Sequence, residues 1–273
     1  MYTCREMDRY IVIHKKIGET PLGALTAWRK EHPHYAQVSA SYAGRLDPMA
    51  EGKLLILLGE ECKRQSAYTN LDKEYEIEVL LDYSSDTGDV LGLPEYSGKE
   101  TRVNPQVLSE VLRKEKGAHT RRYPAFSSKT VAGKPLFLYM LEGKMAEIEI
   151  PEHEERIYSI QVLKVSTLSS TVLHERIQKL LSLAPRSDEP SKELGADFRQ
   201  DEIRKQWEML FKDMPERSFA VLKLRVACAS GTYMRSLAGR IGEALGTKGL
   251  ALSIRRTRIG KYLFGLWPRS FFL

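Results

Sequence analysis

The sequence predicts an α+β fold built on a large, mainly antiparallel mixed sheet flanked by helices. Residues 74–81 and 222–228 alternate between apolar and polar side chains, which is typical of strands with one buried face. Leu237, Ile241 and Leu245 recur at helical spacing between such strands. No internal repeat or low-complexity segment interrupts the pattern, so we expect residues 1–273 to form a single domain.

The elements follow in chain order. Expected strands cover residues 11–13, 54–58, 74–81 and 222–228. Expected helices cover residues 22–29, 103–112 and 237–245. Pro21 suits the first turn of the first helix, and either Thr101 or Asn104 can cap the second. Gly246 ends the last helix.

Residues 171–217 interrupt the strand pattern and are predicted to be a helical insertion. One apolar helical face contains Leu173 and Ile177, and a second contains Ile203 and Trp207. Residues 184–196 between them are rich in Pro, Ser and charge, which indicates a loop. The segment can dock on the body, replace an RNA contact or bind a partner, and we expect no residue of the chemistry to come from it.

Charge and cysteine content restrict the class of protein. The formal net charge is +6, and basic residues concentrate in 113–134 and 248–261. These clusters suit phosphate binding, although they are equally compatible with two solvated faces. Three cysteines stand far apart without ligand spacing, so we expect no zinc or other metal, no disulfide, and a reducing cytoplasm. No apolar run is long enough to span a membrane.

The most reactive-looking carboxylate is Asp47 in Gly44-Arg45-Leu46-Asp47-Pro48. An aspartate before proline is biased toward an extended or turn geometry, and a buried strand follows it. A carboxylate on a stiff loop at the edge of a sheet can act as a nucleophile. Alone, the motif is also compatible with a structural Asx-turn.

Two further side chains suit a site. Tyr75 lies on the apolar face of its strand, where it either packs in the core or stacks on a base. Arg235 lies in the first turn of a helix just after a strand, where it either holds a carboxylate or stays on the surface.

Five motifs in this order resemble the TruB family of tRNA pseudouridine synthases. They are GRLDPMAEG, the DKEY that ends at Tyr75, YPAFSSK with GKPL, SGTYMRSLAGRIGEALG, and IRRTRIGKY. The resemblance runs from Ile11 to Tyr262, apart from residues 171–217. It implies the pseudouridine synthase fold.

The resemblance also implies roles for individual residues. It makes Asp47 the catalytic aspartate, Tyr75 the tyrosine that stacks on the target base, and Arg235 the partner of the aspartate. Further positions are implied to bind substrate: Lys15, Tyr42, Arg121, Arg122, Lys129, Tyr233, Ile254, Arg255 and Arg256.

The implied activity is the isomerisation of a uridine to pseudouridine in folded RNA, at uridine 55 in the T-arm of tRNA. The reaction replaces an N1–C1′ bond by a C5–C1′ bond without redox change or phosphate transfer, so we expect no cofactor. The freed uracil must stay in an apolar pocket. The base must leave its stack, and an aromatic face such as that of Tyr75 recovers part of the cost.

Three departures from the family pattern keep alternatives open. Tyr42 stands where the family has a histidine that holds the RNA loop, and Arg45 is shared with families that modify ribosomal RNA. Few residues follow Tyr262, so we expect no small C-terminal RNA-binding (PUA) domain such as many relatives have, and the 171–217 segment is longer than the family's usual connection. A synthase for another RNA and a non-catalytic RNA-folding protein remain alternatives. We expect RNA as the only partner and a monomer.

Overall fold

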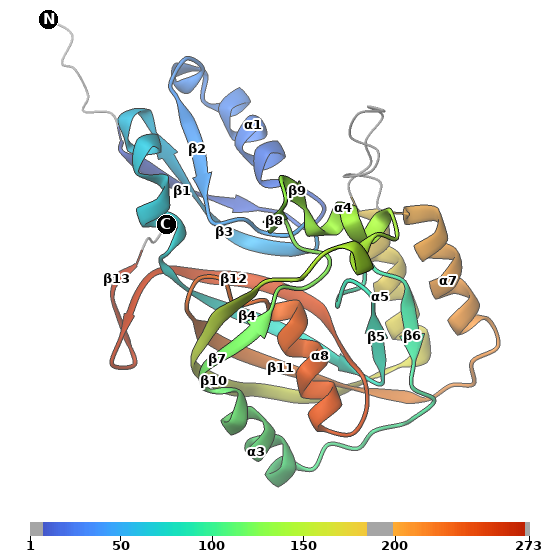
Figure 1. Cartoon of the computed structure of the whole chain (residues 1–273). Coiled ribbons are helices and arrows are strands. Elements are labelled where there is room, and N and C mark those ends of the chain that lie inside the picture. The colour runs from blue at the N-terminus through green and yellow to red at the C-terminus, as the bar shows by residue number, and fades with distance from the viewer. Residues whose placement is uncertain (1–7, 185–198, 271–273) are drawn as a thin grey trace, which may run out of the picture.

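The computed structural model describes residues 8–184 and 199–270, and nine strands form its main sheet (Figure 1). The strand order is β1 (Tyr10–Lys15), β3 (Ala50–Leu58), β12 (Gly249–Leu263), β4 (Asp72–Leu81), β11 (Ser218–Cys228), β10 (Glu152–Ser169) and β7 (Gly117–Arg122). β2 (Ala40–Ala43) pairs with β3, and β13 (Leu266–Ser270) pairs with β12. Within the described ranges, β3 and β12 alone pair in parallel, which confirms the predicted mainly antiparallel mixed sheet.

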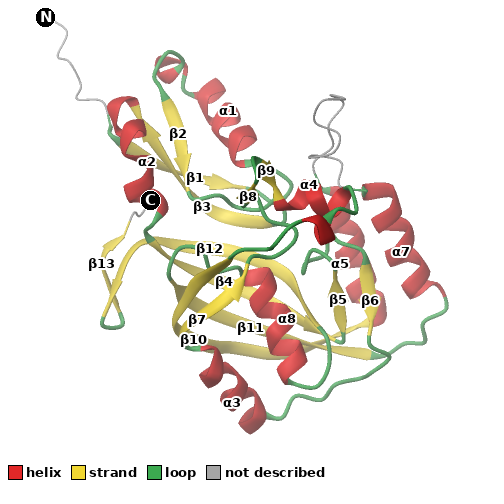
Figure 2. Ribbon diagram, in the orientation of Figure 1, coloured by secondary structure: helices red, strands yellow, loops and turns green. Residues whose placement is uncertain are grey.

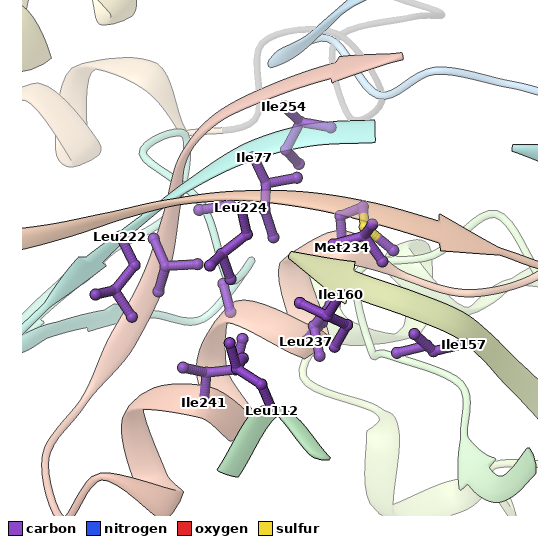
Figure 3. Packing of buried hydrophobic residues seen from close by; sticks show 14 of the residues in the cluster. Ile77, Leu112, Ile157, Ile160, Leu222, Leu224, Met234, Leu237, Ile241 and Ile254 are labelled. Atoms are coloured by element: carbon purple, nitrogen blue, oxygen red, sulfur yellow. The ribbon is translucent and has the colours of Figure 1, made fainter. Parts of the chain in front are cut away.

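Helices cover both faces of this sheet (Figure 2). On one face, α3 (Pro105–Glu115) and α8 (Met234–Ala244) enclose the largest apolar cluster, whose packing Figure 3 shows. On the other, α5 (Ser170–Ser182) and α7 (Gln200–Lys212) pack on a second cluster. The neighbours Leu80 and Leu81 belong to different clusters because consecutive strand residues point to opposite faces.

Helix starts follow their capping residues. α1 (Pro21–Glu31) begins at Pro21, and the amide of Gly23 donates to Thr20 Oγ1 at 2.9 Å. Asn104 rather than Thr101 caps α3, because its Oδ1 accepts from the amides of Gln106 and Val107. All seven strands and helices predicted in order are present, most with wider bounds.

The sequence pattern did not predict the long strands β10 and β12. Their burial does not alternate regularly, because both strands carry bulges against their neighbours. Most of the basic cluster at 248–261 lies on β12 near the centre of the sheet, where Arg256 is buried while Arg255 and Lys261 are exposed.

The 171–217 segment contains α5 and α7 and packs on the body of the protein. Leu173 and Ile177 of α5 and Ile203 of α7 are buried in the second apolar cluster. The indole Nε1 of Trp207 donates to the carbonyl of Val90 at 3.0 Å. The predicted loop at 184–196 lies almost wholly outside the described residues.

Smaller elements complete the chain. They are α2 (Gln65–Thr69), β5 (Tyr83–Ser85), β6 (Pro94–Tyr96), β8 (Thr130–Val131), β9 (Lys134–Pro135), α4 (Leu136–Leu141) and three 3-10 turns (Pro33–Tyr35, Gly59–Arg64, Met145–Glu147). Cys62 and Cys228 are free thiols, and Cys4 lies outside the described residues. Among the helices of the described ranges, none is long and apolar enough to cross a membrane.

Candidate active site

A cavity of about 200 Å³ opens where the β2–β3 loop, β4, β12 and the start of α8 meet. Six of the residues predicted to form the site line it: Asp47, Tyr75, Tyr233, Arg235, Ile254 and Arg256. They come from four separate stretches of the chain, and the sheet order places β12 directly between β3 and β4. We refer to this cavity as the Asp47 pocket.

Arg256 holds the loop that carries Asp47 through hydrogen bonds to backbone carbonyls. Its guanidinium donates through Nε to the carbonyl of Lys53 at 2.7 Å, through Nη1 to that of Arg45 at 3.2 Å, and through Nη2 to that of Gly44 at 3.1 Å. Arg256 is 1% exposed. Gly44 has a φ of 78°, a conformation that favours glycine and turns the chain toward Asp47. The loop is therefore fixed before any substrate arrives.

Arg235 and Asp47 form an ion pair at the edge of the pocket. Arg235 Nε donates to Asp47 Oδ2 at 2.7 Å, and the side chains are 6% and 44% exposed respectively. The other guanidinium nitrogens donate to the carbonyls of Thr87 and Phe126. Because three acceptors surround one planar guanidinium, Arg235 has a single orientation, and it holds the carboxylate toward the pocket.

A second carboxylate, Asp89, lies behind this pair. Its Oδ2 is 3.7 Å from Arg235 Nε, and its Oδ1 accepts from Thr87 Oγ1 at 2.8 Å and from the amide of Leu91 at 2.9 Å. Burial raises the pKa of Asp89 to about 6, although Arg235 opposes that shift. Gly88 lets the loop approach, since a Cβ there would lie 3.2 Å from the backbone oxygen of Arg235.

Two tyrosines form the aromatic part of the pocket. Burial raises the pKa of Tyr75, and burial with the nearby Asp47 raises that of Tyr233 to about 12. Both phenols therefore stay protonated at neutral pH. Ile254 is 4% exposed and adds an apolar wall.

The remaining predicted substrate-binding residues lie outside the pocket. Lys15 is fully buried, and its Nζ donates to the carbonyl of Ala50 at 2.6 Å; burial lowers its pKa to about 8. Tyr42 packs against the apolar cluster beneath α1. Four cations are exposed or half-buried at the surface: Arg121, Arg122, Lys129 and Arg255. Arg121 Nη2 lies 3.7 Å from Glu115 Oε1. Arg122 Nε lies 3.9 Å from Glu152 Oε1.

The 171–217 segment docks on the body beside the site, which is one of the alternatives that the sequence left open. Arg199 Nη2 pairs with Asp86 at 2.7 Å, and its guanidinium lies over the Phe126 ring at 5.1 Å. A neighbouring cavity of about 90 Å³ is lined by Asp47 and Arg235 together with Ile203 and Arg204 of α7. The segment thus contacts both loops whose carbonyls accept from Arg235.

Sequence reasoning missed Asp89, Thr87 and Lys73 as site residues. Asp89 and Thr87 belong to Ser85-Asp86-Thr87-Gly88-Asp89, a polar turn after a strand, and that turn is the only signal the sequence offers for them. Lys73 precedes Tyr75 in a quoted motif and lines the Asp47 pocket while 4% exposed. Their contact with distant segments depends on the fold.

The sheet and its helical layers are those of the pseudouridine synthase fold. A family model described as "TruB family pseudouridylate synthase (N terminal domain)" matches residues 33–178. The chain belongs to the TruB family.

Named relatives support this membership, and a solved structure shares the fold. A "tRNA pseudouridine synthase B" of Azoarcus sp. (strain BH72) is 30% identical over 94% of this chain and 67% of its own length. A protein of the same name from Francisella philomiragia subsp. philomiragia is 28% identical over 82% of this chain and 56% of its own. The crystal structure of a Cbf5-Nop10-Gar1 complex matches the fold with a TM-score of 0.53 at 20% identity, over 92% of this chain and 48% of that one. This chain therefore spans between about half and two thirds of the length of these proteins.

Proposed function

We propose that this protein isomerises a uridine to pseudouridine in tRNA, at uridine 55 of the T-arm. The observation that carries the proposal is the Asp47–Arg235 pair at the edge of a pocket with aromatic and apolar walls. Relatives over most of this chain are named tRNA pseudouridine synthase B, which favours tRNA over ribosomal RNA as the target.

In this proposal Asp47 is the nucleophile. Its Oδ2 accepts from Arg235 Nε at 2.7 Å, and the side chain lines the pocket while 44% exposed. The carboxylate bonds to the sugar as the N1–C1′ bond breaks, or stabilises the charge on the sugar, and any such bond breaks again when C5 bonds to C1′. The uracil turns, C5 bonds to C1′, and the proton on C5 is lost while N1 gains one. Substrate and product are isomers, so neither electrons nor groups are exchanged.

The other pocket residues keep the base in place. Tyr75 presents a protonated phenol ring on which the flipped base can stack, and Tyr233 with Ile254 limits the space around it. Arg121, Arg122, Lys129 and Arg255 are proposed to bind the RNA backbone outside the pocket, with Lys15 and Tyr42 supporting the loop. We propose that the protein acts as a monomer in the cytoplasm, where tRNA is modified.

The test uses an unmodified T-arm stem-loop labelled with tritium on C5 of its uridines. Bond formation at C5 releases tritium to water, so the wild type should release one equivalent per target uridine. Asp47→Asn should bind the same RNA and release none, because an amide keeps the shape without the nucleophile. A stem-loop with cytidine at the target position should release none with either protein. Wild-type release from a ribosomal RNA fragment but not from the T-arm would assign the other target.

A further inference from the structure

The Asp47 pocket is lined by more cations than the single cation that pairs with Asp47. Its ionisable lining, tyrosines aside, consists of four cations and one carboxylate: Arg45, Lys73, Arg235, Arg256 and Asp47. Asp47 pairs with Arg235 at 2.7 Å. Across the described ranges, no ion pair joins Arg45, Lys73 or Arg256 to a carboxylate. A uracil ring is neutral and does not require this charge.

Two of these cations are buried and adjacent. Lys73 is 4% and Arg256 is 1% exposed. They converge on Gly44, where a Cβ would lie 3.5 Å from Arg256 Nη1 and 3.8 Å from Lys73 Nζ. Burial, and then the charge of Arg256, lower the pKa of Lys73 to about 8. Two buried positive charges that lie this close together destabilise the folded state unless a negative charge accompanies them.

Lys73 has donors left for an anion, whereas the three guanidinium nitrogens of Arg256 already donate to the carbonyls of Lys53, Arg45 and Gly44, so Arg256 contributes mainly its charge. Lys73 Nζ donates to the carbonyl of Thr69 at 2.6 Å, which uses one of its three protons. Asp72 is the carboxylate whose charge acts to raise the pKa of Lys73. Its oxygens already accept from the hydroxyl of Tyr158 at 2.8 Å and from the amide of Tyr262 at 2.9 Å. Cys228 is buried with a pKa raised to about 12, so it is neutral.

We propose that Lys73 and Arg256 form a subsite in the Asp47 pocket for a phosphodiester that flanks the target uridine. This inference rests on the proposed function, because it takes RNA as the ligand. Phosphate oxygens accept charge-assisted hydrogen bonds from ammonium and guanidinium groups. The bound phosphate supplies the counter-charge that the pair lacks and anchors the nucleotide backbone beside the loop of Asp47. Lys73 is thus a positioning residue for the reaction.

The experiment compares stem-loops that differ by one charge. One RNA has ordinary phosphodiesters, a second has a methylphosphonate 5′ of the target uridine, and a third has it 3′. Binding is measured in the Asp47→Asn background, so that RNA is not consumed. One of the two methylphosphonates should weaken binding by about tenfold, the effect of one charge-assisted hydrogen bond.

Lys73→Met should weaken binding of the ordinary RNA by the same factor and make the sensitive methylphosphonate harmless. Lys73→Arg should keep the sensitivity, because it keeps the charge. Lys205→Met, which removes an exposed lysine of α7, is the matched control and should leave the methylphosphonate effect unchanged.

If Lys73→Met weakens the binding of all three RNAs by the same factor, relative to the protein that keeps Lys73, the methylphosphonate effect does not depend on Lys73. That result would overturn the subsite. If that variant does not fold, the Asp47→Asn protein with Lys73 intact decides: equal binding of the ordinary RNA and both methylphosphonate RNAs also overturns the subsite. The proposed function is read separately, from tritium release by the wild type. A wild type that senses the methylphosphonate but releases no tritium keeps the subsite and loses the activity.

Discussion

Arg235 Nε lies 2.7 Å from Asp47 Oδ2, although 188 residues separate the two in the chain. The pair joins the start of α8 to the β2–β3 loop. Because the remaining guanidinium nitrogens are used by the carbonyls of Thr87 and Phe126, the orientation of Asp47 depends on two further loops.

Arg235→Lys should fold but turn over RNA at least about a hundredfold more slowly, since one ammonium cannot reach three acceptors in a planar fork. Single-turnover tritium release at saturating enzyme measures the chemical step, and a melting curve checks the fold. A fully active lysine variant would show that the fork is not needed to orient Asp47.

Asp89→Asn should change how stability depends on pH. The pKa of Asp89 is raised from 3.8 to about 6, so the folded protein holds a proton there that the unfolded chain has lost. The contribution of Asp89 to the free energy of unfolding therefore falls as pH rises from about 4 to about 6, by roughly 3 kcal/mol. Urea unfolding at pH 4, 5, 6 and 7 should show the wild type losing stability relative to Asp89→Asn over this window. Parallel curves for the two proteins would contradict the buried position of the carboxyl.

Arg199→Ala should slow the chemical step about tenfold while RNA affinity stays within twofold. Arg199 contacts Asp86 and the Phe126 ring, and through them the loops that hold Arg235. Lys205→Ala removes an exposed cation from α7, the helix that Arg199 directly precedes, and should have no effect. If both variants react at the wild-type rate, α7 does not support the site.

RNA affinity should fall steeply with salt, because binding releases counterions from the phosphates. Arg122→Ala should reduce the slope of log affinity against log salt by about one. Arg122 is 75% exposed and lies 3.9 Å from Glu152, so its charge is available to RNA. Lys248 is 26% exposed and pairs with Glu95, so Lys248→Ala should change the slope less. An identical slope for wild type and Arg122→Ala, measured from about 50 to 200 mM salt, would remove β7 from the RNA-binding surface.

Local patterns in the chain predicted most of the framework. Alternation in residues 74–81 predicted β4, and helical spacing of Leu237 and Ile241 predicted α8, because these periods follow from backbone geometry alone. Bulges in β10 and β12 break the alternation, so those strands become visible only when their partners are in place.

The sequence by itself determined the family, the identity of the carboxylate, tyrosine and arginine expected in the site, and the order of the elements that carry them. Tertiary structure alone decided which side chains surround that carboxylate. Asp89 behind Arg235, Arg199 over Phe126, and Lys73 beside Arg256 come from segments far apart in the chain. Contacts of this kind depend on sheet order and helix docking, which are set by burial over the whole domain. No local spacing encodes them, since a side chain's partners and its desolvation depend on every element packed around it.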